Sequence, residues 1–108
     1  MEDAMRAILA LLIATTANVA CAGELEFSYE SFQMTQTGAA ELVIKFTNRT
    51  GAHLDYAVAR CALLDADNKA ITTMPVIARD MPVGTIAYAK NYGPRDSRVK
   101  HVNCRIER

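Results

Sequence analysis

Tryptophan is missing from this chain, histidine occurs twice, and neither sign of charge is in excess, because 12 Lys and Arg face 12 Asp and Glu. A neutral domain has no strong basic field to attract phosphate backbones, which excludes dedicated nucleic-acid binding from the expected functions. Hydrophobic residues make up 51% of the 108 residues, too many for a disordered polyelectrolyte. The length therefore predicts one small globular domain.

Motifs that carry catalysis or bind cofactors are also missing. No Gly-x-Ser-x-Gly elbow and no Cys-x-x-Cys pair occurs. Asp65-Ala66-Asp67 begins like a calcium loop, but Ala70 stands where that loop needs glycine, so a hairpin turn explains these residues better. We therefore expect no enzyme, no cofactor and no metal. The alternative left open is a metal- or small-ligand-binding periplasmic protein, with His53 and His101, joined by Asp55 or a cysteine, as candidate ligands.

A long apolar run is found at the N-terminus. Residues 7–14 are uninterrupted apolar positions, Arg6 precedes them, and a small-residue stretch ending in Ala20-Cys21-Ala22 follows. This order is typical of a secretory signal peptide. The apolar run is shorter than the roughly 20 apolar residues of a transmembrane helix. We predict a signal peptide over residues 1–22, with Met5 as an alternative start, and a mature domain over residues 23–108 without a transmembrane segment. The expected location is the periplasm or the exterior, and lipid anchoring at Cys21 is the alternative.

The mature chain keeps two cysteines, Cys61 and Cys104. An even pair in an exported protein predicts one intramolecular disulfide, because oxidising compartments let such bonds persist. Closing a loop of about 43 residues stabilises a domain by about 4 kcal/mol in the chain-entropy estimate. A metal or thiol-redox site is the competing interpretation, which the missing Cys-x-x-Cys pattern disfavours.

Apolar and polar residues alternate with a period of two along the mature chain, which predicts strands rather than helices. Leu25, Phe27 and Tyr29 share one face, and the apolar phase then shifts to Phe32, which predicts a bulge near Ser31. Residues 54–64 are apolar on both faces, which predicts a central strand. The expected strands cover residues 25–34, 42–47, 54–64, 70–78, 86–92 and 99–107.

Turn residues separate these segments. Residues 65–69 predict a tight hairpin in which Asn68 takes the left-handed conformation. Pro75 cannot donate a ladder hydrogen bond, which predicts an edge position for its strand. Residues 81–85 and 93–96 predict further turns. Six or seven strands with this spacing predict an all-β, two-sheet sandwich in which the disulfide fastens the central region, with Cys104 turned toward the core.

Three stretches of the chain carry a family resemblance, namely Phe46 to Gly51, Cys61 to Lys69, and Met81 to Thr85. From Glu41 to Glu107 the chain resembles the FxLYD-type bacterial immunoglobulin-like domain, in which an aromatic-x-Leu-Tyr-Asp run ends a central strand before a D-x-D-G turn. Leu63 and Asp65 match that pattern, whereas the first aromatic, the Tyr and the Gly are replaced by Cys61, Leu64 and Asn68. The resemblance implies an immunoglobulin-like β-sandwich that serves as an envelope or extracellular module.

Six basic residues concentrate near the C-terminus, with tyrosines beside them, namely Lys90, Arg95, Arg98, Lys100, Arg105 and Arg108. A candidate patch for an anionic partner comprises Lys90, Arg95, Arg98 and Lys100, with Tyr88 and Tyr92 nearby. The alternative is a solvated outer face whose charges protect an edge strand from aggregation. The expected function is an exported immunoglobulin-like module that binds an unidentified protein or envelope component, or that has a structural role.

Overall fold

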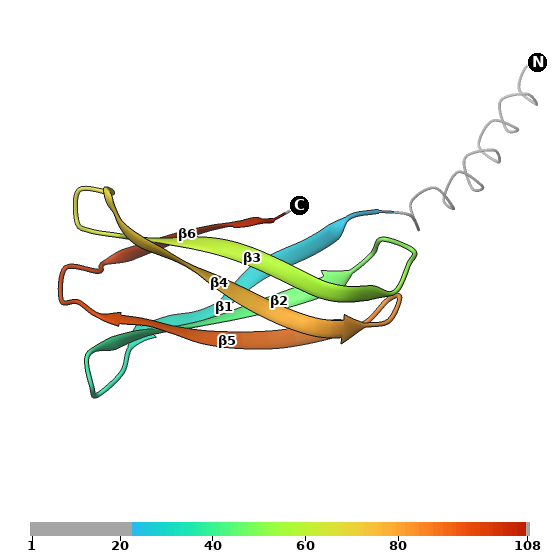
Figure 1. Cartoon of the computed structure of the whole chain (residues 1–108), viewed down its shortest axis with the longest axis horizontal. Helices are drawn as coiled ribbons and strands as arrows, with labels where there is room; N and C mark the ends of the chain where they lie inside the picture. Colours follow the sequence, from blue (N-terminus) through green and yellow to red (C-terminus); the bar gives the residue numbers. More distant parts are fainter. Residues whose placement is uncertain (1–22, 108) are drawn as a thin grey trace, which may run out of the picture.

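The structure is a computed structural model that describes residues 23–107. Its six strands form two three-stranded antiparallel sheets, ordered β1-β2-β5 and β4-β3-β6, which face each other as the layers of a sandwich (Figure 1). The expected all-β, two-sheet sandwich is thereby confirmed. The strands are β1 (Leu25–Met34), β2 (Ala39–Asn48), β3 (Leu54–Leu64), β4 (Ala70–Met81), β5 (Ile86–Arg95) and β6 (His101–Ile106).

The chain passes repeatedly between the two sheets. β1 and β2 form a hairpin in one sheet, and β3 and β4 form a hairpin in the other. The chain then returns to place β5 beside β2 and crosses once more to place β6 beside β3. Consecutive strands thus interlock across the sandwich, as in Greek-key folds. The turns that join β1 to β2, β3 to β4 and β5 to β6 lie together at one end, on the left of Figure 1.

The core follows from the period of two along β2 and β3. Alternate residues of β2 are fully buried, and the same alternation runs along β3 from Ala57 to Leu63. Each inward side chain packs against the opposite sheet, because neighbouring residues of a strand point to opposite faces. The largest fully buried hydrophobic side chains are Leu42, Ile44, Phe46, Leu63, Val76 and Met81.

Two hydrogen bonds connect the sheets along their open sides. On one side, Asn91 of β5 donates from Nδ2 to the backbone oxygen of Pro75 on β4, at 2.6 Å. On the other side, the Tyr29 hydroxyl of β1 accepts a bond from the backbone N–H of Cys104 on β6, at 2.8 Å. Each bond satisfies a backbone group that an edge strand leaves unpaired. The sandwich is thus fastened on both sides by side chains.

Asn48 connects the end of β2 in one sheet to the end of β4 in the other sheet. Among the described residues it is the one polar residue that is buried, and it is the last residue of β2. Its Nδ2 donates to the backbone oxygens of Ala52 and Met81, both at 2.9 Å. Its Oδ1 accepts from the Thr50 backbone N–H at 3.0 Å and from the Thr50 hydroxyl at 2.7 Å. One side chain therefore holds the β2–β3 connection against the end of β4.

Several local predictions are confirmed. The β1–β2 register shifts between Tyr29 and Ser31, where a bulge was expected. Asn68 has a φ of 63° in the hairpin between β3 and β4. β3 is the central strand of its sheet, and β4, which contains Pro75, is an edge strand. Cys104 is buried on the inward face of β6, as the alternation predicted.

The bounds of four strands differ from the predictions. β2 covers Ala39–Asn48 rather than residues 42–47, and β6 ends at Ile106 rather than at residue 107. β4 continues to Met81, because the bond from Asn48 holds its last carbonyl group against β2. β5 continues to Arg95 through residues 93–94, which were expected to turn, and β6 begins later, at His101. Gly93 lies in β5 at a point where the strand passes close to the other sheet. A Cβ atom at this position would lie 2.5 Å from Leu63 Cδ1.

Candidate functional site

The predicted disulfide is present and lies within one sheet. Cys61 on β3 and Cys104 on β6 are directly opposite each other in the ladder and are bonded. The N–H of Cys104 points away from β3 toward Tyr29, so the two cysteines form the closely spaced, non-hydrogen-bonded kind of antiparallel pair. In antibody domains the disulfide instead connects the two sheets. Here it fixes the pairing and the register of β3 and β6.

Lys90, the first residue of the predicted basic patch, lies on the outward face of β5. Its Nζ is 3.6 Å from Glu41 Oε2 on β2 and 5.9 Å from the ring centroid of Tyr92. The pKa of Glu41 is lowered, mainly by a hydrogen bond from Gln33 and further by Tyr92 and Lys90. Glu41 and Lys90 therefore form an ion pair on the outward face of this sheet.

The other three residues of the predicted patch lie at or beyond the end of β5. Arg95 is the last residue of β5, and both Arg98 and Lys100 belong to the connection to β6. Arg98 forms a two-pronged ion pair with Asp96, with Nη2–Oδ2 at 2.7 Å and Nε–Oδ1 at 3.0 Å. The hydrogen bonds from Arg98 lower the pKa of Asp96 to about 2. Two of the four bases are thus paired with acids, and the role of the set in binding an anionic partner stays a prediction.

Of the candidate metal ligands, only His53 lies beside acidic side chains that the structure describes. Its Nε2 is 2.7 Å from Asp80 Oδ1 and its Nδ1 is 3.6 Å from Asp55 Oδ1, whereas His101 is exposed on β6. Asp65 Oδ1 accepts the backbone N–H groups of Asp67 and Lys69 at 2.8 and 3.0 Å, so this carboxylate shapes the hairpin, as expected. Within residues 23–107, no group of three or more His, Cys, Asp or Glu side chains is arranged to hold a metal ion.

The outward face of β5 presents an aromatic and aliphatic line. Ile86, Tyr88 and Tyr92 are each more than half exposed, at 52%, 60% and 52%. They alternate with Ala87, Ala89 and Asn91, which face the second sheet, and Lys90 stands among them. We call Ile86, Tyr88, Lys90 and Tyr92 the β5 face. Large apolar side chains that are gathered on one exposed strand are typical of a surface for partner contact.

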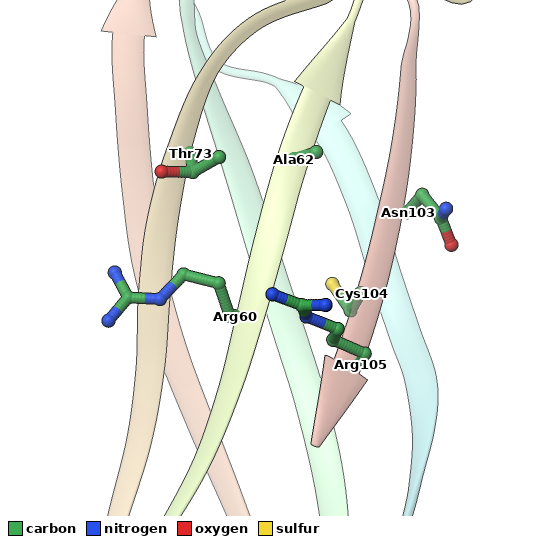
Figure 2. Close-up of a pocket in the computed structure, with 6 residues that line it drawn as sticks. All are labelled: Arg60, Ala62, Thr73, Asn103, Cys104 and Arg105. Atoms are coloured by element: carbon green, nitrogen blue, oxygen red, sulfur yellow. The ribbon is translucent and has the colours of Figure 1, made fainter. Parts of the chain in front are cut away.

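The outward face of the second sheet is hollowed on the opposite side of the sandwich. A hollow of about 270 Å³ lies between Arg60 and Ala62 of β3, Thr73 of β4, and Asn103, Cys104 and Arg105 of β6. The small side chain of Ala62 leaves this space open between Thr73 and Asn103, its partners in the ladders on either side. Figure 2 shows Arg105 extending over β3 and Arg60 extending over β4. Polar side chains thus surround a shallow depression.

Of the two arginines at this hollow, Arg105 belongs to the basic run near the C-terminus that the sequence indicates, whereas Arg60 was not identified as a site residue. Arg60 and Arg105 are directly opposite in the β3–β6 ladder, next to the disulfide. Arg60 pairs with Glu107, with Nη2–Oε1 at 3.0 Å, whereas Arg105 has no ion pair with any residue that the structure describes. The cysteine pair is the sequence feature that predicts that Arg60 and Arg105 lie opposite each other. Once Cys61 is placed opposite Cys104, the antiparallel register places their neighbours opposite each other.

Comparison with known proteins adds no relative: no family model, curated protein or solved structure matches this chain. The likeness to FxLYD domains therefore rests on the motif residues alone and stays a prediction. The predicted signal peptide, the alternative start at Met5 and lipidation at Cys21 lie outside the described residues. In residues 23–107 no helix is long and apolar enough to cross a membrane.

Proposed function

We propose that this chain is an exported β-sandwich module that binds a protein of the cell envelope through its β5 face. The observation that carries the proposal is the exposed line of Ile86, Tyr88 and Tyr92 on one edge strand. Tyrosine suits such contacts, because its ring buries a large apolar area and its hydroxyl still makes hydrogen bonds. Lys90 already has Glu41 as an ion-pair partner, so the contact depends on the aromatic side chains more than on charge.

Export is supported by the disulfide as well as by the N-terminal pattern. A bond between Cys61 and Cys104 persists in oxidising compartments and is rare in the cytosol. The intact mass of the protein from its native host tests this part of the proposal. We expect a chain that begins at Gly23 and is about 2 Da lighter than the dithiol form. A chain that retains residues 1–22, or that carries free thiols, would contradict export to an oxidising compartment.

Site-specific crosslinking tests the binding surface. A photoreactive amino acid is placed at Tyr88 or Tyr92 in the full chain and irradiated in the native host. Tyr56 is the matched control, because it is 58% exposed and lies on the outward face of the opposite sheet. We expect a discrete protein adduct from positions 88 and 92 and none from position 56. If positions 88 and 92 give no adduct, or give the same adducts as position 56, the β5 face is not a binding surface.

A further inference from the structure

Arg60 and Arg105 place two positive charges directly opposite each other in the β3–β6 ladder. Side chains directly opposite in an antiparallel pair have Cβ atoms about 4.5–5.5 Å apart, and like charges in this position repel each other. Glu107 offsets the charge of Arg60, but no described acid pairs with Arg105. A third arginine, Arg79, is on the same outward face, with its guanidinium 4.9 Å from the Tyr56 ring centroid. This face therefore carries uncompensated positive charge.

The hollow beside these arginines is lined with hydrogen-bond donors. A guanidinium carries five N–H donors and no acceptor, the Asn103 amide carries two donors, and the Thr73 hydroxyl carries one. The side chains of Thr73, Asn103 and Arg105 make no hydrogen bond to any residue that the structure describes. These donors come from two different strands, β4 and β6, on either side of Ala62. The group that fits must be negatively charged and rich in acceptors.

From this arrangement we propose that the hollow between Arg60, Thr73, Asn103 and Arg105 is a binding site for a phosphate group. A tetrahedral phosphate offers acceptors in several directions, which matches donors that surround a depression better than a planar carboxylate does. Arg105 supplies the fork of parallel N–H donors, and Ala62 leaves room for the anion. The phosphate belongs either to a small soluble phosphate compound or to a lipid head group. The site is on the opposite side of the sandwich from the β5 face, so each proposal can fail without the other.

Titration with inorganic phosphate, followed by NMR of the backbone amides, is the direct test. We expect saturable shifts at β3 and β6 residues around the hollow, with a dissociation constant on the order of 1 mM for so open a site. Arg105→Gln weakens binding about tenfold or more. Arg105→Lys weakens it less, since the charge remains but the fork is lost. Arg79→Gln is the control, because it removes the same charge from the same face outside the hollow, and it changes affinity less than about twofold.

A second measurement separates the two sources of phosphate. Vesicles of phosphatidylcholine with phosphatidic acid are compared with vesicles of phosphatidylcholine alone, using the native protein and Arg105→Gln. Binding to the acidic vesicles that is lost in Arg105→Gln assigns the site to a lipid head group. Binding of inorganic phosphate without vesicle binding assigns it to a soluble phosphate compound. If neither probe binds, or if Arg105→Gln and Arg79→Gln weaken binding equally, the site does not exist.

Discussion

Replacement of Asn48 by alanine tests whether a single buried amide connects the two sheets. The side chain donates to the Met81 and Ala52 carbonyl groups and accepts two bonds from Thr50. Four hydrogen bonds at about 1 kcal/mol net each set an upper value of about 4 kcal/mol. In the variant, water replaces the hydrogen bonds to Thr50 and Ala52 in part, because these residues are near the surface. The buried Met81 carbonyl group, in contrast, loses its partner. We expect the free energy of unfolding to fall by about 2–4 kcal/mol.

Urea denaturation measures this loss, with the disulfide intact in every variant. Asn103→Ala makes the same chemical change at an exposed position, and we expect it to stay within about 0.5 kcal/mol of the native protein. Asn48→Asp separates hydrogen bonding from volume. It keeps the shape but cannot donate to Met81, so it destabilises at least as much as alanine does. A loss below about 1 kcal/mol for Asn48→Ala, or a well-tolerated Asn48→Asp, would refute the connecting role.

Three further predictions concern other parts of the fold. Replacing Cys61 and Cys104 together by alanine should lower the free energy of unfolding by about 2–5 kcal/mol in urea titrations, because the loop is no longer closed. The Asp96 carboxyl should titrate by NMR with a pKa of about 2, and its pKa should return toward 3.8 in Arg98→Gln. Because the folded-state pKa is lowered, this ion pair stabilises the β5–β6 connection above about pH 4 and is lost as the pH falls through about 2. Gly93→Ala should cost about 1–3 kcal/mol in thermal unfolding, because the added Cβ atom overlaps a side chain of the other sheet.

The sequence predicts the elements whose pattern is local. β1 and β3 have the predicted bounds, because strict alternation and flanking turn residues determine where such strands start and stop. The predictions are wrong where a distant contact decides the outcome. Gly93 resembles a turn residue in the sequence, but it lies in β5, at a point where an added Cβ atom would meet Leu63 Cδ1 of the other sheet. Asn48 resembles a turn residue as well, and the buried acceptor that its amide reaches, the Met81 carbonyl oxygen, lies 33 residues away.

The candidate surfaces divide in the same way. Alternation along one strand suffices to predict that Tyr88 and Tyr92 share a face, because this relation needs no partner strand. Which bases remain free of acids depends on loop geometry that no local pattern contains, as the Asp96–Arg98 pair shows. The pairing of Arg60 and Arg105 depends on which strand lies beside β3. A disulfide between the two strands supplies that information, and spacing alone does not.

The disulfide and the arginine pair occupy successive positions of one ladder. β6 is the shortest strand and has β3 as its only hydrogen-bonded neighbour in its sheet. Two like charges directly opposite each other disfavour such a ladder, whereas the covalent bond between Cys61 and Cys104 holds the next pair of residues together. Within residues 23–107 no acid forms an ion pair with Arg105. Its guanidinium donors are therefore available to an added anion, and this is why phosphate should bind at this ladder rather than at the ion-paired bases near the end of β5.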